Sequence, residues 1–174
     1  FRIPDEEIKK DYDIAVNQGV KFEFGREVTE KYEDLKKDFD YVVVATGAWA
    51  HGNSPVVEGQ ENVTDALEFL WNVRMGDGFD LGKKVAVIGA GDVAMDCTRL
   101  AARQEGVESV SLVYRRTESY MPATQEEVND VKEEGHEILE LVAPVKYDGK
   151  VLSCKKMALG EFDESGRKGI HETG

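Results

Sequence analysis

The stretch "VAVIGAGDVAMDCTRLAARQ" (Val85–Gln104) decides the fold of this chain. Its first residues are apolar and mostly β-branched, which is typical of a strand buried in a sheet. It then passes through Gly-Ala-Gly into a segment whose apolar positions recur at helical spacing. We therefore predict a strand over Val85–Ile88, a tight turn, and a helix that runs to about Gln104.

The turn has the spacing G-x-G-x-x-A, made by Gly89, Gly91 and Ala94. The first glycine permits the sharp turn, the second leaves room for a pyrophosphate, and the small alanine lets the helix pack close to the strand. The beginning of such a helix presents unpaired backbone N–H groups and a partial positive charge to phosphates. Because the motif follows an expected strand and opens an expected helix, it predicts a dinucleotide site.

The next strand, predicted over Ser109–Tyr114, completes a right-handed strand–helix–strand unit. Units that bind NAD end this strand with an acid that holds the ribose 2′-hydroxyl, whereas a 2′-phosphate requires arginine. This chain has "VYRRT" there, with Arg115 and Arg116 at the end of the strand. A guanidinium binds phosphate bidentately and stacks on adenine. The sequence therefore predicts NADP(H).

Two alternatives remain open for these arginines. Glu118 lies close enough in sequence to leave an NADH-specific site as an alternative. The second alternative is purely structural, with the arginines forming exposed ion pairs, which are common and weak. The acids within reach for that role are Glu118, Glu126 and Glu127.

The first part of the chain contains a predicted helix that follows Pro4 and ends at Gly19, and then a strand over Val20–Phe24. The charged stretch Lys31–Asp38 predicts a hairpin or loop. "FDYVVVATGA" (Phe39–Ala48) predicts a strand that is apolar on both faces and belongs in the middle of a parallel sheet. A connector rich in Gly, Asn, Ser and Pro follows, and indicates a domain boundary.

The remaining elements predict an α/β domain that carries an antiparallel meander. A helix capped by Thr64 is expected to reach Met75, and another capped by Thr124 to reach about Glu134. "HEILELVAPVKY" and "KVLSCKKMALGEF" predict two strands joined by an Asp148–Gly149 turn. The final residues, "DESGRKGIHETG", are expected to form a turn and a tail.

Composition narrows the function classes. The 174 residues carry 35 acidic and 22 basic side chains, a net charge of −13. This argues against nucleic acid, whose phosphates require clustered Lys and Arg. No apolar run is long enough to span a membrane, and the first residues lack the apolar core of a signal peptide. The chain does not begin with Met, so we interpret it as a fragment of a longer protein.

The cysteines and histidines form no recognisable reactive group. Cys97 and Cys154 stand at neither a metal-binding nor a C-x-x-C spacing, so we expect packed thiols in a reducing compartment, the cytoplasm. The three histidines have no partner at catalytic or metal-binding spacing and are expected at the surface. They are His51, His136 and His171.

Three stretches together carry a family resemblance: "VAVIGAGDVAMDCTRLAARQEG", "VYRRTESYMPATQEEVNDVKEEG" and "DFDYVVVATGA". They closely resemble the FAD/NADPH-linked region of the glutamate synthase small subunit family, which is of the pyridine nucleotide-disulphide oxidoreductase type. That region is shared with dihydropyrimidine dehydrogenase and with selenate reductase-like iron–sulfur flavoproteins. The resemblance extends over essentially the whole chain.

The resemblance implies a glutathione reductase-like fold, in which a Rossmann-like, three-layer ββα NADPH domain is inserted into an FAD domain. Residues 1–48 would be a partial FAD-binding segment and residues 49–174 the NADPH-binding domain. Asp96 would point towards the nicotinamide, with a capping or buried helix acid as the alternative. Arg115 and Arg116 would hold the 2′-phosphate. The other residues carried over are Gly89, Ala90, Gly91, Asp92 and Val93 at the pyrophosphate and Ala45, Thr46 and Gly47 against the flavin nucleotide.

The chain departs from the family pattern in lacking the first FAD glycine fingerprint, the cysteine-rich iron–sulfur region and the closing flavin-contacting segment. We therefore expect this fragment to bind NADPH and to hold FAD poorly. The resemblance implies that the full-length parent passes hydride from NADPH to FAD and onward to a separate acceptor, with iron–sulfur clusters elsewhere. Other domains or subunits of the parent would be its partners. No catalytic side chain or metal ligand is expected here, because the cofactors carry the chemistry.

Two other function classes remain as alternatives. One is a non-catalytic nucleotide-sensing or interaction domain, in which the segment "SYMPATQEEV" docks a partner. The other is a methyltransferase with a similar glycine turn, which "YRR" speaks against, because ribose hydroxyls require an acid there. The residues that select the final electron acceptor lie outside this chain.

Overall fold

A parallel three-stranded sheet forms the centre of the larger of two compact units, Ala50–Gly174. The computed structural model describes residues 3–50, 52, 54–162, 164 and 166–173. The sheet has the order β1-β2-β3, with β1 at Lys84–Ile88, β2 at Ser109–Tyr114 and β3 at Glu137–Glu140. Both pairs are parallel. The sequence predicts the first pair from its strand–helix–strand pattern. The second pair corrects the prediction, which placed the residues of β3 in the antiparallel meander.

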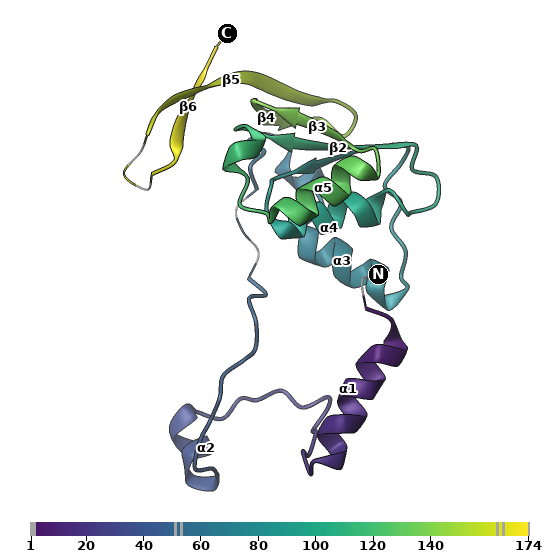
Figure 1. Ribbon diagram of the computed structural model, residues 1–174, viewed down its shortest axis with the longest axis vertical. Coiled ribbons are helices and arrows are strands. Elements are labelled where there is room, and N and C mark those ends of the chain that lie inside the picture. The colour runs from purple at the N-terminus through teal and green to yellow at the C-terminus, as the bar shows by residue number, and fades with distance from the viewer. Residues whose placement is uncertain (1–2, 51, 53, 163, 165, 174) are drawn as a thin grey trace. The chain divides into compact units, whose positions relative to one another are not determined.

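Three helices cover one face of this sheet (Figure 1). They are α3 (Ala66–Met75), α4 (Asp92–Ala101) and α5 (Gln125–Glu133). The helix α4 connects β1 to β2, and α5 connects β2 to β3. Asp65, rather than the predicted Thr64, caps α3 by accepting hydrogen bonds from two backbone N–H groups. Thr124 caps α5 as predicted.

The core lies between the helices and the parallel sheet. One cluster contains Met95 of α4, Leu112 of β2 and Val128 and Val131 of α5, all of them buried. A second cluster centres on Phe69 of α3, with Cys97 and Leu100 of α4 and Val110 of β2. Apolar residues on one side of each helix therefore fix its distance from the sheet.

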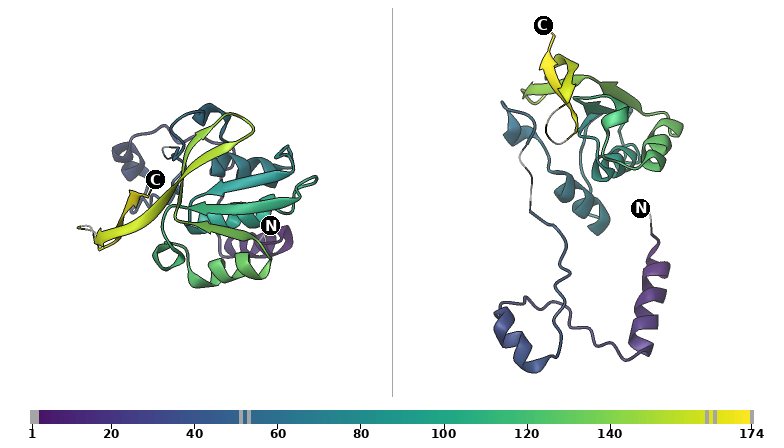
Figure 2. Two further views of the ribbon diagram at one scale, coloured as in Figure 1. Left: turned by 90° about the horizontal axis from the view of Figure 1, so that it is seen from above. Right: turned by 60° about the vertical axis from the view of Figure 1, so that its left-hand side comes forward.

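An antiparallel sheet forms the third layer. Its strands are β4 (Val142–Tyr147), β5 (Leu152–Phe162) and β6 (Lys168–Glu172), in that order. The left view of Figure 2 shows β5, in yellow-green, crossing over the parallel strands. The layers of sheet, sheet and helix confirm the predicted ββα arrangement. Short one-turn helices, η1 (Gln60–Asn62) and η2 (Glu118–Tyr120), complete the unit.

Two details of the meander differ from the sequence prediction. The stretch predicted as one strand divides at Leu141, whose φ of 56° turns the chain from the parallel to the antiparallel sheet. The predicted tail is in fact the strand β6, because Ile170 pairs with Leu159 of β5. The predicted turn at Asp148 is confirmed: its carboxylate accepts hydrogen bonds from the N–H groups of Lys150 and Val151.

In the smaller unit, Phe1–Trp49, the described residues form two helices. α1 spans Asp5–Asn17 as predicted, and the ring of its Tyr12 lies 4.8 Å from that of Phe22, centroid to centroid. α2 spans Tyr32–Asp38, so the prediction of a hairpin or loop there is wrong. The acids in its first turn and lysines in its last complement the helix dipole, which favours the helix.

The two strands predicted in this unit, Val20–Phe24 and Phe39–Ala48, do not form among the described residues. The side chains of Tyr41, Val43 and Val44, predicted to be buried in a sheet, are 90%, 85% and 75% exposed. A strand requires a neighbour for its backbone hydrogen bonds, and the described part of this unit supplies none. These two segments therefore form no backbone hydrogen-bond ladder among the described residues.

Within the described ranges, no helix is both long enough and apolar enough to cross a membrane.

We predict that Leu112→Ala lowers the free energy of unfolding by about 3 kcal/mol, because it leaves a cavity between β2, α4 and α5. Urea denaturation followed by circular dichroism measures the change. Val151→Ala, at a side chain that is 59% exposed, is the control and is expected to change stability by less than about 0.5 kcal/mol. Equal losses in the two variants would contradict the placement of the core.

Candidate nucleotide-binding site

The glycine turn begins where β1 ends. Gly89 has a φ of 140°, a conformation that favours glycine, and its N–H donates to the carbonyl of Val113 in β2 at 3.1 Å. A Cβ at Gly89 would lie 3.4 Å from the Cβ of Ala94, so the turn and the first turn of α4 pack closely. The three small residues thus have the local roles that their spacing predicts.

Gly91 is the residue that caps the N-terminus of α4. Its carbonyl accepts hydrogen bonds from the N–H groups of Ala94 and Met95, at 2.8 and 3.2 Å. No side chain caps this helix, so no side chain accepts a hydrogen bond from its first backbone N–H groups. A Cβ at Gly91 would meet only the Cγ of Pro122, at 3.9 Å, and Gly91 has an ordinary φ of −88°. The chain itself therefore leaves this position open.

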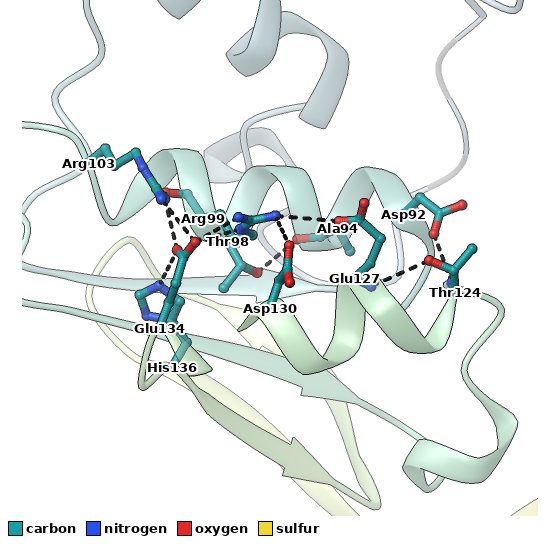
Figure 3. Close-up of polar contacts among 10 residues, drawn as sticks. All are labelled: Asp92, Ala94, Thr98, Arg99, Arg103, Thr124, Glu127, Asp130, Glu134 and His136. Carbon is teal, nitrogen blue, oxygen red and sulfur yellow. Dashed lines mark hydrogen bonds and ion pairs between the residues drawn. The ribbon is translucent and has the colours of Figure 1, made fainter. Parts of the chain in front are cut away.

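The carboxylate of Asp92 faces the N-terminus of α5 (Figure 3). Its Oδ1 accepts a hydrogen bond from the N–H of Thr124 at 3.0 Å, and the N–H of Ala123 donates to the carbonyl of Ala90 at 3.1 Å. Sequence reasoning placed Asp92 in the pyrophosphate turn and missed this second role. The two bonds fasten the segment before α5 beside the glycine turn.

Arg115 and Arg116 follow β2, at the same edge of the sheet as the glycine turn. Arg116 is half-buried, and its Nε donates to the carbonyl of Lys168 in β6 at 2.8 Å. Arg115 is exposed and has no hydrogen-bond or ion-pair partner among the residues that the structure describes. The guanidinium of Arg115 is therefore available to a ligand.

A pocket of about 430 Å³ opens at this edge. It is lined by Tyr114, Arg115, Arg116, Tyr120, Met121, Pro122 and Arg167. The hydroxyl of Tyr114 donates to the carbonyl of Tyr120 at 2.7 Å, which holds the η2 segment over the end of β2. Because Pro122 also borders Gly91, the pocket adjoins the glycine turn. Sequence reasoning missed Arg167, which reaches the pocket from the β5–β6 hairpin.

The other residues that the sequence predicts for the site do not line the pocket. Asp96 is half-buried on α4 and has an interaction partner in the chain. Val93 is 45% exposed at the beginning of the same helix. Ala45, Thr46 and Gly47 lie in the smaller unit, where Trp49 Nε1 donates to the carbonyl of Thr46 at 2.8 Å. These three residues therefore belong to a different compact unit from the residues that line the pocket.

A comparison with protein families matches residues 4–140 to the pyridine nucleotide-disulphide oxidoreductase family. The chain belongs to this family. The resemblance carried by the three quoted stretches is thereby confirmed.

Similar proteins include YgfK of Escherichia coli (strain K12), provisionally named an oxidoreductase, which is 41% identical over 99% of this chain. The NADPH-Fe(3+) oxidoreductase subunit beta of Geobacter sulfurreducens is 36% identical over 97% of the chain. The glutamate synthase [NADPH] small chain of Escherichia coli (strain K12) is 33% identical over 97%. The chain spans 17%, 27% and 40% of these three proteins, respectively.

Among solved structures, FprA of Mycobacterium tuberculosis in complex with NADPH is similar, with a TM-score of 0.64 and 19% identity. The match covers 83% of this chain and 48% of that one. At this identity the match shows a shared fold.

An ion-pair network joins α4 to α5 behind the site (Figure 3). Arg99, whose side chain is 15% exposed, pairs with Asp130 at 2.7 Å and with Glu134 at 2.8 Å. Arg103 also pairs with Glu134, at 2.9 Å. Hydrogen bonds from Arg103 and Arg99 lower the pKa of Glu134 to about 2. The network fixes α5, and with it the pocket wall formed by the segment before α5.

The histidines and cysteines differ in part from the predictions. The side chain of His136 is only 13% exposed, so its predicted surface position is wrong. Its Nε2 lies 3.6 Å from a carboxylate oxygen of Glu134, so the ring lies beside the network that joins α4 to α5. His171 is exposed as predicted, and His51 lies outside the described residues.

Cys97 is buried as predicted, and burial raises the pKa of its thiol to about 12. Cys154 is exposed, which corrects the prediction of a packed thiol. Its position on β5 explains the difference, because the residues of this strand from Ser153 to Lys156 are all exposed.

We predict that the Glu134 network stabilises the fold above about pH 4.5 and that this stabilisation is lost as the pH falls towards 2. The pKa of Glu134 is lowered in the folded chain, so protonation below its unfolded pKa favours unfolding. Glu134→Gln should cost about 1–2 kcal/mol at pH 7 and almost nothing near pH 2. Urea midpoints measured across this range test the prediction.

The exposed neighbour provides the control for this experiment. Glu133→Gln removes the same charge from the same helix end, outside the network. A pH-independent difference between wild type and Glu134→Gln would contradict the prediction.

Proposed function

We propose that this chain is the NADPH-binding region of a flavin and iron–sulfur oxidoreductase, which passes hydride from NADPH to FAD and on to a separate acceptor site. The observation that carries the proposal is the pocket at the edge of the parallel sheet, which is lined by Arg115 and Arg116 and adjoins, through Pro122, the glycine that begins a helix without a side-chain cap. The relatives named for NADPH support the same ligand.

The residues present fit NADPH in two places. The position of Gly91 is an opening that a side chain would fill, next to the first N–H groups of α4, and the pyrophosphate would lie there. The backbone of Gly89–Val93 would bind it. Arg115 and Arg116 would bind the 2′-phosphate. When bound, NADPH supplies the hydride and FAD accepts it; the chain contributes orientation and charge.

The positions of two acids weigh against the alternatives for the arginines. The carboxylate of Glu118, which an NADH-specific site would require, is bonded to Lys132 Nζ at 2.6 Å, and this bond lowers its pKa. Glu127 faces Arg99 instead of the arginine pair. Both observations favour a ligand phosphate as the partner of Arg115.

The segment proposed as a docking motif in the alternative function is used within the fold. Ala123 and Thr124 bond to Ala90 and Asp92, and Tyr120 bonds to Tyr114. These internal contacts favour a role as a wall of the nucleotide pocket over a role as an interaction motif.

The remaining parts of the proposal concern the longer protein. Because the chain spans less than half of each of the named relatives, we propose that residues outside it complete the FAD site together with Ala45, Thr46 and Gly47, and hold the iron–sulfur clusters. Asp96 is proposed to lie towards the nicotinamide. The two cysteines are free thiols, which supports a cytoplasmic location.

We expect Arg115→Ala to weaken NADPH binding about tenfold while leaving NADH binding unchanged, because it removes one charge-assisted contact to the 2′-phosphate. Arg116→Ala should do the same, with an added loss of stability from its bond to Lys168. Isothermal titration of the chain with each nucleotide measures both effects. Unchanged NADPH affinity in Arg115→Ala would show that the 2′-phosphate lies elsewhere.

A second pair of variants tests the glycine turn. Gly91→Ala should fold normally, since its Cβ meets only Pro122, but should weaken NADPH and NADH equally, by about tenfold or more, because both share the pyrophosphate. Gly89→Ala should instead lower the melting temperature, because its φ of 140° strains an alanine. If Gly91→Ala binds both nucleotides with wild-type affinity, the pyrophosphate does not lie at the glycine turn.

The oxidoreductase activity is tested in the full-length protein by reduction of its flavin with NADPH. A full-length protein without flavin would overturn this part of the proposal even if the chain binds NADPH.

A further inference from the structure

We propose that Arg167 is a third cation for the 2′-phosphate and a specificity-determining residue for NADPH over NADH. This inference rests on the proposed function. Arg167 lies directly before β6, far along the chain from the arginine pair, yet it lines the same pocket as Arg115 and Arg116. No spacing rule in the sequence connects it with the glycine turn.

The fold holds Arg167 at the pocket through its neighbour. The Nε of Arg116 donates to the carbonyl of Lys168 at 2.8 Å, so the backbone next to Arg167 is tied to the end of β2. Lys168 also pairs with Phe162 across the hairpin. The beginning of β6 is thereby fixed to both sheets.

The side chains of Arg167 and Lys168, where the chain enters β6, have different neighbours. The ammonium of Lys168 lies 4.4 Å from the centroid of the Phe162 ring, whereas Arg167 lines the pocket. Of the two cations, the structure gives only Arg167 a position among the pocket arginines.

The charge of the pocket points to a phosphate. Three arginine residues line one pocket in a chain whose net charge is −13. Their mutual repulsion is relieved by an anion, and a phosphomonoester carries nearly two negative charges at pH 7. Arg167 also has a contact within the chain. A guanidinium carries five N–H donors in a planar fork, so it can bond within the chain and to a phosphate oxygen at the same time.

The position of the arginines favours the 2′-phosphate over the pyrophosphate. The end of β2 is the place in this fold that selects the substituent on the ribose, and Arg116 at that end is bonded to the residue after Arg167. The pyrophosphate has its own partners in the backbone of the glycine turn. Arg167 therefore acts on the group that distinguishes NADPH from NADH.

The test compares NADPH and NADH binding by Arg167→Gln and by wild type in the intact protein, by isothermal titration. We expect about tenfold weaker NADPH binding with NADH unchanged, the loss of one charged contact. Arg167→Lys, which keeps the charge, should recover part of the affinity. Lys150→Gln, in the exposed β4–β5 turn, removes one positive charge from the same sheet away from the pocket and should change neither affinity.

A pH series separates a direct contact from a structural effect. The second ionisation of a phosphomonoester lies near pH 6, so the NADPH preference of wild type should rise between about pH 5.5 and 7.5. This rise should be smaller in Arg167→Gln. An equal loss of NADPH and NADH, or an unchanged preference, overturns the inference. A wild type that prefers NADH, or that binds neither nucleotide, overturns the proposed function instead.

Discussion

The parallel pairing of β1 with β2 is the constraint on which the site depends. Ile88 lies opposite Val113, and the N–H of Gly89 continues the ladder by donating to the Val113 carbonyl. Both strands therefore leave the sheet at the same edge, one into the glycine turn and the other into Arg115 and Arg116. A shift of one residue in this register would turn the apolar side chains of β2 away from the core, so the packing of Leu112 also fixes where the arginines emerge.

A second constraint keeps the wall of the pocket in place. The segment between β2 and α5 is held at one end by the Tyr114 hydroxyl and at the other by Asp92. Behind it, Arg99 and Arg103 draw α5 onto α4 through Glu134. The wall is thus attached to the helix whose N-terminus would face the pyrophosphate. The candidate nucleotide site and the packing of α5 on α4 therefore depend on the same contacts.

The sequence predicts the part of the fold that local chemistry determines. The strand β2 and the cap at Thr124 follow from short patterns of apolar residues, turn residues and capping side chains. The prediction of a strand over Phe39–Ala48 was wrong because an apolar run forms a strand only where a second strand pairs with it. The pattern within the run does not show whether such a partner is present. β6 was missed for a related reason: its pairing with β5 crosses a hairpin and depends on few residues of its own. Arg167 was missed with it, because its place at the pocket comes from that pairing.

Several of the basic side chains named above pair with acids of the chain, whereas Arg115 at the end of β2 does not among the described residues. Acids outnumber basic residues, and on the helices the two kinds meet: Arg99 faces Asp130, and Lys132 faces Glu118. At the end of β2 the arginines lack such a partner nearby in the sequence, because the carboxylate of Glu118 is already bonded to Lys132. The chain has 35 acidic residues, yet Arg115 pairs with no acid among the described residues, which favours a ligand anion as its partner. An acidic protein can therefore keep an arginine free for a phosphate when its carboxylates pair with other basic side chains.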